Sequence, residues 1–513
     1  MTIRWGRCFN FNKCKDASEK QHIPIPKGAP FICPECKEPL VDEHAFAPHE
    51  AHATPNTPGK KSPNILLVAA AVVLILAVVA GFARWGMKLG AKASTSKTIL
   101  RLAGSNTIGD TLGPSLAEAF LKDQGATNVR ILPGANPLEK IVEGVLPGDS
   151  TPSSITIAAH GSATAFTSLA ESSCDIGMAS RKIKSDEAAK LKSLGNMSSV
   201  ANEHVLGLDG IAVIVNASNP ASQLDKDKIM RIFTGEITDW SQVAAYKGAI
   251  KVYARNDNSG TYDTFKSLVL GGKPLAAGTQ RIEDSKALSD AVAADPYGIG
   301  FIGLPYIQSS KPIAVSDKGT LALLPTRLTV GTEDYLLSRR LFLYTPGNPG
   351  NKYTRQFIEF AISSKGQDVV AATGFVAQNV TQVAQAVPVD APSEYKSLAR
   401  DANRLSLNFR FASGQMDLDN KAKIDLDRVV SLMADLNIPE DKIMLFGFSD
   451  STGDYSANQA LSLSRAQVVE RQLILRGLKP AIVRGFGSNL AVASNDSDEG
   501  QARNRRVEVW IKK

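Results

Sequence analysis

Residues 65–83 form an unbroken run of 19 uncharged, mostly aliphatic residues, and this run limits the possible folds more than any other sequence feature. As an α-helix it would extend about 28 Å, close to the thickness of the hydrocarbon layer of a membrane. A cleaved signal peptide has a shorter apolar stretch near the N-terminus, whereas more than 60 residues precede this run. We therefore predict one transmembrane helix at 64–84, retained as an anchor in a lipid bilayer.

The rest of the chain has the composition of folded domains. Its 513 residues allow about three domains at roughly 150 residues each. Apolar residues make up 43% and charged residues 21%, which excludes a wholly disordered or fibrous chain. The net charge of +7 is spread without a strongly basic block, so we expect no nucleic-acid partner.

Two proline-containing stretches divide the chain further. Residues 44–63 are rich in Pro, Ala and His and lack an apolar period, which predicts a solvated linker. A second linker is predicted at 387–399. Between them, apolar strand-like runs alternate with helix-like segments over 97–386, which indicates an α/β domain. Residues 400–513 follow a strand and helix order that predicts a compact α+β sheet with helices on one face.

Four of the five cysteines lie within the first 36 residues. Cys33 and Cys36 form a CxxC turn whose thiolates can share a tetrahedral Zn²⁺ ion, and Cys8 and Cys14 can complete the site. The segment 1–43 resembles a zinc ribbon, although five residues separate the first two cysteines. A redox CxxC and unliganded thiols are the alternatives. Because thiolate zinc sites favour a reducing compartment, we expect this end in the cytoplasm, where the ribbon can serve a protein partner.

Three loops that follow predicted strands have a composition suited to binding an anion. Each combines glycine with Ser, Thr or Asn before a predicted helix, where hydroxyls and backbone N–H groups can converge on negative charge. The third loop is preceded by an arginine, which can form paired hydrogen bonds with an oxyanion; an exposed surface arginine is the alternative. The candidate residues are Ser105, Asn106, Thr107, Ser162, Arg255, Ser259, Gly260 and Thr261.

The motifs AGSNT, HGSAT, DIGMASRKI, IMRIFTGEITDW and RNDNSGTYDTF occur in this order within residues 97–386. Together they resemble the periplasmic phosphate-binding proteins of ABC importers. The resemblance implies two lobes joined by crossover strands, with phosphate hydrogen-bonded between them by the candidate residues. It adds Ser180, where the best-known members place an aspartate that accepts the proton of hydrogenphosphate. Because a hydroxyl can both donate and accept, we expect weaker rejection of sulfate. A degenerate lobe pair that binds nothing is the alternative.

The C-terminal region offers one carboxylate and one guanidinium that can converge. Asp450 follows a predicted strand and Arg465 lies on the next predicted helix, so the two can clamp a zwitterion or form an internal salt bridge. The sequence GFSDSTGDYSANQALSLSRAQVVE and the later NRRVEVW resemble the OmpA-like peptidoglycan-binding domain over 400–513. The resemblance implies that Asp450 receives the ammonium group of diaminopimelate and Arg465 its carboxylate. Supporting contacts are implied for Asn458, Leu461 and Asn504.

These features predict an inner-membrane protein with a cytoplasmic N-terminus and periplasmic C-terminal domains. The charges that flank residues 64–84 do not settle this orientation and, taken alone, favour the opposite one; the predicted orientation follows from the resemblances of the domains. The predicted function is non-enzymatic binding of phosphate, or a similar oxyanion, and of peptidoglycan. The alternative is a membrane-to-wall tether whose middle lobes are a spacer. A phosphatase that uses Ser105 or Ser259 is disfavoured because the sequence shows no associated metal cluster or general base.

Overall fold

The structure is a computed structural model that describes residues 4–7, 22–25, 33, 41–42, 96–257, 259–411 and 416–513. It forms two compact units, residues 1–92 and residues 93–513. In the first unit, the strands β1 (Arg4–Arg7), β2 (His22–Ile25) and β3 (Val41–Asp42) form an antiparallel sheet in the order β2-β1-β3. Cys33 is buried.

Several predictions for the first unit fall outside the described residues. They are the transmembrane helix at 64–84, the linker at 44–63 and the ligands Cys8, Cys14 and Cys36. Within the described ranges, no helix combines the length and apolar character needed to cross a membrane. The same ranges contain no cluster of three or more His, Cys, Asp or Glu residues suited to a metal ion.

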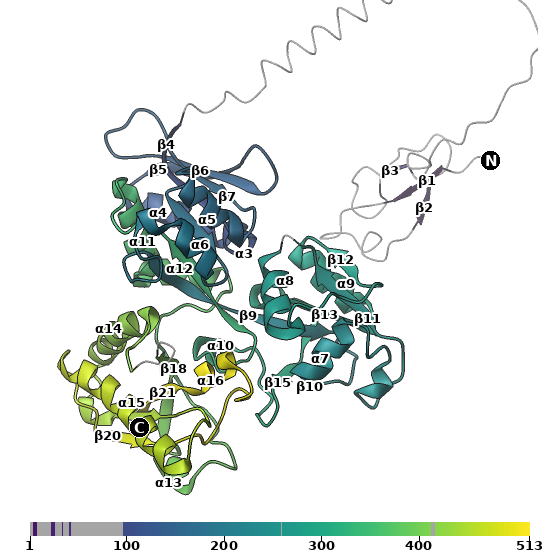
Figure 1. Ribbon diagram of the computed structural model, residues 1–513. Coiled ribbons are helices and arrows are strands. Elements are labelled where there is room, and N and C mark those ends of the chain that lie inside the picture. Colours follow the sequence, from purple (N-terminus) through teal and green to yellow (C-terminus); the bar gives the residue numbers. More distant parts are fainter. Residues whose placement is uncertain are drawn as a thin grey trace, which may run out of the picture. The chain divides into compact units, whose positions relative to one another are not determined.

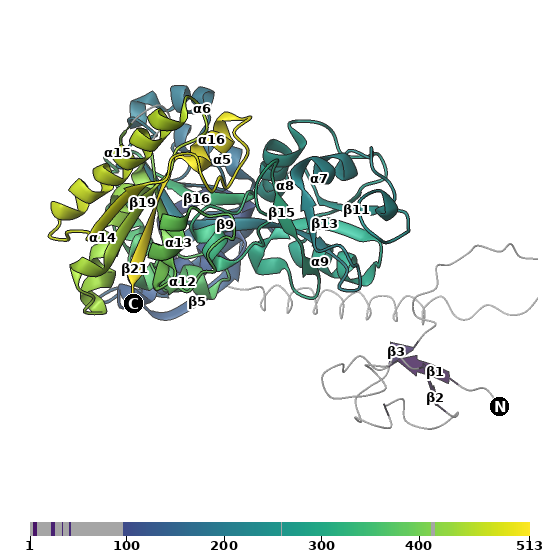
Figure 2. The ribbon, with the colours of Figure 1, turned by 90° about the horizontal axis from the view of Figure 1, so that it is seen from below.

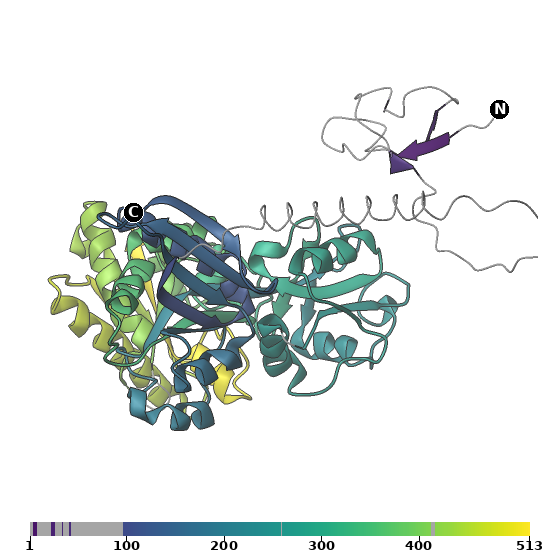
Figure 3. The ribbon, with the colours of Figure 1, turned by 90° about the horizontal axis from the view of Figure 1, so that it is seen from above.

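An eleven-stranded sheet runs through both lobes of the α/β domain, and its main path follows the order β12-β11-β13-β9-β16-β8-β4-β7-β6-β5. The first lobe, blue in Figure 3, contains β4 (Lys97–Gly104), β5 (Thr127–Pro133), β6 (Glu139–Val145), β7 (Ser153–Ala158) and β8 (Ile176–Ala179). Its helices are α3 (Asn106–Gly109), α4 (Leu112–Asp123), α5 (Ser162–Ala170), α6 (Ser185–Lys190), α11 (Lys352–Ile362) and α12 (Ser364–Ala372).

The second lobe, teal in Figures 1 and 3, is built on β11 (Lys251–Arg255), β12 (Gln280–Ile282), β13 (Gly298–Gly303) and β14 (Lys311–Pro312). A separate parallel pair joins β10 (Gln223–Asp225) to β15 (Ala314–Ser316). The helices of this lobe are α7 (Lys226–Phe233), α8 (Gly260–Phe265), α9 (Ser285–Ala294) and α10 (Arg327–Gly331). The predicted two-lobed α/β fold is confirmed.

Two antiparallel strands cross between the lobes. They are β9 (Glu203–Val215) and β16 (Ser338–Tyr344), and Figure 1 shows β9 running from the first lobe into the second. Almost every residue of β9 is buried, because both faces of the sheet are covered, and this explains its nearly continuous apolar sequence. The two strands connect the lobes, and the cleft lies between the lobes that they join.

The C-terminal domain has a five-stranded sheet in the order β17-β18-β21-β19-β20. Its strands are β17 (Gln382–Val383), β18 (Ala402–Arg410), β19 (Ile443–Gly447), β20 (Ile482–Gly485) and β21 (Arg506–Lys512). Its helices are α13 (Ser393–Ala399), α14 (Asn420–Asp435), α15 (Tyr455–Ile474) and α16 (Asp498–Asn504). Figure 2 shows α14 and α15 beside the sheet, and Leu445 and Val509 pack in the core that these helices cover.

The sequence-based boundary at 387–399 differs from the structure. Residues 393–399 form α13, whose Tyr395 packs against Phe446 and Trp510 on the second face of the sheet. The expectation of helices on one face only is therefore wrong, as is the assignment of the whole segment as a linker. Pro392 suggested a break in structure, but it stands at the start of the helix, where proline is well tolerated.

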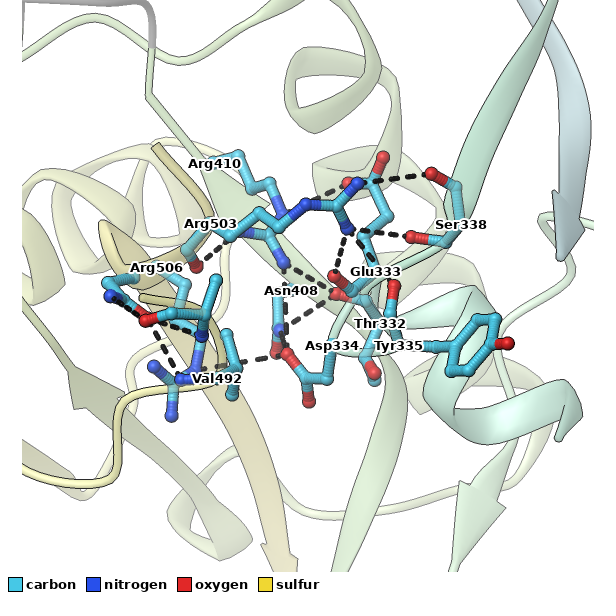
Figure 4. Close-up of polar contacts among 12 residues, drawn as sticks. Thr332, Glu333, Asp334, Tyr335, Ser338, Asn408, Arg410, Val492, Arg503 and Arg506 are labelled. Carbon is cyan, nitrogen blue, oxygen red and sulfur yellow. Dashed lines mark hydrogen bonds and ion pairs between the residues drawn. The ribbon is translucent and has the colours of Figure 1, made fainter. Parts of the chain in front are cut away.

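Buried ion pairs dock the C-terminal domain against the α/β domain (Figure 4). Glu333, in the turn before β16, accepts hydrogen bonds from Nε of Arg340 at 2.6 Å and from Nε of Arg410 at 3.0 Å. The neighbouring Asp334 accepts from Nη2 of Arg404 at 2.8 Å. Arg404 and Arg410 lie on β18, so the two domains share one buried charge cluster. Breaking such a pair leaves an uncompensated buried charge.

This docking is expected to weaken in acid. Burial raises the pKa of Glu333, but the guanidinium groups of Arg340 and Arg410 outweigh it and hold that pKa well below its ordinary value. A carboxyl group with a depressed pKa stabilises the fold above its unfolded pKa, about 4.3, and loses this contribution as pH falls. We expect Glu333→Gln to lower the free energy of unfolding by about 3 kcal/mol at pH 7 and by less at pH 3, where the carboxyl is already largely protonated in the unfolded chain although it is still ionised in the folded chain.

Urea unfolding of the full-length chain at both pH values measures this difference. Equal losses of stability at pH 7 and pH 3 would contradict the role given to the Glu333 carboxylate.

Candidate functional site

The predicted anion-binding loops meet in the cleft between the lobes. A Cβ atom added to Gly260 would lie 2.5 Å from Oγ of Ser180, 3.6 Å from Oγ1 of Thr107 and 3.7 Å from Oγ of Ser162. These four residues belong to α8, to the segment after β8, to α3 and to α5. The loops therefore approach the backbone of Gly260 from several sides, and the absence of a side chain there leaves room between them.

Several polar side chains of this cluster are buried. Ser180 donates its backbone N–H to Oγ of Ser162 at 3.0 Å, and the two hydroxyls lie 3.1 Å apart. Oγ of Ser105 and Oδ1 of Asn106 are buried and have no hydrogen-bond partner among the described residues. Since buried polar groups normally find a partner, these atoms leave hydrogen-bonding capacity in the cluster.

A cavity of about 560 Å³ opens at this cluster. Its walls include the predicted residues Asn106, Thr107, Arg255, Ser259 and Thr261. The other four predicted residues, Ser105, Ser162, Ser180 and Gly260, are buried beside these walls. A single small oxyanion would fill only part of the cavity.

Arg255 supplies a cation to the cavity wall. Its Nη1 donates to Oγ of Ser285, and its Nε is buried without a partner in the described part of the chain. Burial lowers the pKa of Arg255, while the charge of Asp284 opposes this shift. The side chain is half-buried, so the interpretation of Arg255 as an exposed surface arginine is wrong.

A buried ion pair on the crossover strands belongs to none of the sequence motifs. Arg339 of β16 bonds Oδ2 of Asp209 on β9, with Nη2 at 2.7 Å and Nε at 3.0 Å. The same guanidinium donates to the carbonyl of Gly260 at 2.7 Å, to Oγ1 of Thr261 at 3.0 Å and to Oγ1 of Thr107 at 3.3 Å. One arginine thus connects loops of both lobes. The sequence feature that could have revealed this pair is a single aspartate, Asp209, within the apolar sequence of β9.

The C-terminal site brings Asp450 and Arg465 into one charged cluster with Arg505. Asp450 accepts from Nη1 of Arg505 at 3.0 Å and from the backbone N–H of Thr452 at 3.0 Å. Burial lowers the pKa of Arg465 to about 10, and the nearby charge of Asp450 opposes this shift. Arg465 donates to the carbonyl of Phe448, while its Nε has no partner among the described residues. The internal ion pair of Asp450 is therefore made with Arg505.

The three supporting residues occupy different environments. Asn458 is buried and donates to the carbonyl of Gly453 at 3.5 Å, while Leu461 is half-buried on α15. Asn504 is fully buried. Its Oδ1 accepts hydrogen bonds from the backbone N–H groups of Val492 and Ala493 in the preceding loop. Asn504 thus supports the loop beside the cluster.

Comparisons with known proteins agree with this architecture. A family model described as a PBP superfamily domain matches residues 91–365, and an OmpA family model matches residues 410–505. A phosphate-binding protein PstS of Staphylococcus aureus is 30% identical over 238 residues, which cover 45% of this chain and 71% of that protein. The PstS of Staphylococcus haemolyticus is 29% identical over 226 residues, covering 42% of this chain and 70% of its own.

Among solved structures, a putative phosphate ABC transporter substrate-binding protein with bound phosphate from Clostridium perfringens is 27% identical. It matches with a TM-score of 0.42, and the match covers 55% of this chain and 99% of that chain. The first family model spans more than half of the 513 residues, and the chain covers more than two thirds of the Staphylococcus aureus relative. This chain therefore belongs to the PBP superfamily and carries a C-terminal OmpA domain.

Proposed function

We propose that this chain binds phosphate between its two lobes and peptidoglycan through its C-terminal domain. The observation that best supports phosphate binding is the approach of Thr107, Ser162 and Ser180 to the backbone of Gly260. Hydroxyls, backbone N–H groups and Arg255 suit an oxyanion, and the relatives are named as phosphate-binding proteins. For peptidoglycan, the proposal rests on the OmpA family match and on the cluster of Asp450 with Arg465.

We further propose an extracytoplasmic location for both domains, with residues 64–84 as an inner-membrane anchor. In this topology residues 1–43 lie in the cytoplasm, hold structural zinc through Cys8, Cys14, Cys33 and Cys36, and offer a surface to a protein partner. Both matched families are binding proteins, and the proposed role is accordingly capture of ligands without chemical conversion.

Isothermal titration of the full-length chain with phosphate and with sulfate tests the anion site. We expect saturable binding of phosphate at one site and measurable binding of sulfate. Heat with neither anion would contradict the proposal and favour a tether whose lobes are a spacer.

The selectivity of the site is expected to depend on residue 180. Ser180→Asp places a carboxylate beside the anion, where it can accept the proton of hydrogenphosphate but repels sulfate, which carries no proton at neutral pH. We expect the ratio of phosphate affinity to sulfate affinity to rise at least about tenfold relative to Ser180→Asn, which has the same size without the charge. Titration of both variants with both anions measures the ratio. An equal ratio in the two variants would show that residue 180 does not contact the anion.

A further inference from the structure

The C-terminal domain makes hydrogen bonds to both lobes of the α/β domain. On the first lobe, Nδ2 of Asn420 donates to the carbonyl of Ser198 at 2.9 Å and to Oε1 of Glu203 at 3.2 Å. On the second lobe, the backbone N–H of Ser494 donates to Oδ2 of Asp317 at 3.1 Å. The domain therefore bridges the two lobes that line the cleft.

The C-terminal domain also contacts the beginning of a crossover strand. Arg503 of α16 donates through Nη1 to the carbonyls of Glu333 and Tyr335, both at 3.1 Å, and to Oγ of Ser338 at 2.9 Å. Its Nη2 donates to the carbonyl of Ser338 at 3.1 Å. Figure 4 shows this guanidinium directed at the turn before β16 and at Ser338. Only 12% of the Arg503 side chain is exposed, so these bonds are shielded from water.

The residue after Ser338 is Arg339, which reaches the anion loops. Its guanidinium donates to the carbonyl of Gly260 and to the hydroxyls of Thr261 and Thr107. Hydrogen bonds thus run from α16 to Ser338, and from the adjacent Arg339 to the cluster around Gly260. Arg505 lies two residues after Arg503, at the C-terminal end of α16, and pairs with Asp450 of the C-terminal site.

We propose that Arg503 is a positioning residue for the anion cleft and that, through it, phosphate binding and peptidoglycan binding are coupled. Arg503 fixes the start of β16 and hence the position of Arg339 behind the anion loops. A ligand of the C-terminal site that shifts the end of α16 at Arg505 also changes the hydrogen bonds of Arg503 to the turn before β16 and to Ser338. Coupling of this kind is reciprocal, so phosphate must change the affinity for peptidoglycan by the same factor. This inference rests on the proposed function.

The test compares phosphate binding by Arg503→Ala and Arg503→Lys in the full-length chain. The control is Arg476→Ala, because Arg476 pairs with the exposed Asp427 on the surface of the same domain. We expect Arg503→Ala to weaken phosphate binding by about tenfold or more, Arg503→Lys to weaken it less, and Arg476→Ala to leave it unchanged. Arg503→Ala with wild-type affinity would overturn the proposal.

A second measurement separates positioning from a general loss of stability. We expect a soluble peptidoglycan fragment that contains diaminopimelate to shift the phosphate dissociation constant of the wild-type chain at least about fivefold, and to shift that of Arg503→Ala much less. An unchanged constant in the wild type would overturn the coupling. A wild-type chain that binds no phosphate would contradict the proposed function itself, whereas equal phosphate binding by wild type and Arg503→Ala would contradict this inference alone.

Discussion

Replacing Gly260 with valine is expected to weaken phosphate binding by at least about 100-fold. Even a Cβ atom at this position would lie 2.5 Å from Oγ of Ser180, and the valine methyl groups would extend further among the hydroxyls of the cluster. The bulk would displace the anion from at least two hydrogen bonds. Two such bonds to a charged ligand contribute about 3 kcal/mol or more, and about 1.4 kcal/mol corresponds to a factor of ten in affinity.

The matched control is Gly278→Val in the same lobe. A Cβ atom at Gly278 meets nothing within 4 Å, and the backbone there does not require a positive φ. We expect this variant to bind phosphate as the wild type does, with both affinities measured by isothermal titration. Wild-type affinity in Gly260→Val would mean that phosphate does not bind at the converging loops.

Removing the charge of Asp450 or that of Arg465 is expected to abolish sedimentation with peptidoglycan. The side chain of Asp450 is 10% exposed and Arg465 is 5% exposed, so a bound zwitterion would pair with largely desolvated charges. Each charge would form a buried, hydrogen-bonded pair with the ligand. Truncating one partner of such a pair costs about 2–5 kcal/mol, or roughly 30-fold or more in affinity. We expect this loss for Asp450→Ala and for Arg465→Ala.

Two kinds of control accompany this test. Asp450→Asn keeps the size of the side chain and removes its charge, which separates loss of the ligand from loss of the fold. Asp427→Ala and Arg476→Ala break an exposed ion pair of the same domain, which should contribute at most about 1 kcal/mol to stability and nothing to binding. Retention of Asp450→Ala on peptidoglycan at the wild-type level would rule out this cluster as the wall-binding site.

The sequence alone predicted the features that depend on local order. Apolar runs marked β4, β7, β11 and β13, and the residues just after three of these strands form the predicted anion-binding loops. The resemblance of the motifs to periplasmic phosphate-binding proteins then implied the two-lobed fold, while the alternation of strands and helices indicated only an α/β domain with ligands at the carboxyl ends of its strands. These inferences needed only neighbours along the chain and a known arrangement of strands.

Contacts between distant segments could not be predicted in the same way. Asp209 and Arg339 are 130 residues apart, and neither belongs to a recognisable motif. Glu333 and Arg410 resemble ordinary surface charges in the sequence, yet they are buried where the two domains dock. The helix α13 was missed because prolines obscured the apolar residues that pack against the sheet. In each case a contact between distant segments determined the burial or secondary structure of residues whose local composition did not predict it.

We propose that one chain holds phosphate and peptidoglycan at the same time. Sedimentation of purified peptidoglycan sacculi with the full-length chain and radiolabelled phosphate tests it most directly. We predict that labelled phosphate sediments in proportion to the protein and that Gly260→Val removes the label while leaving the protein in the pellet. Protein that sediments without phosphate, at phosphate concentrations that would saturate the cleft, would contradict the claim.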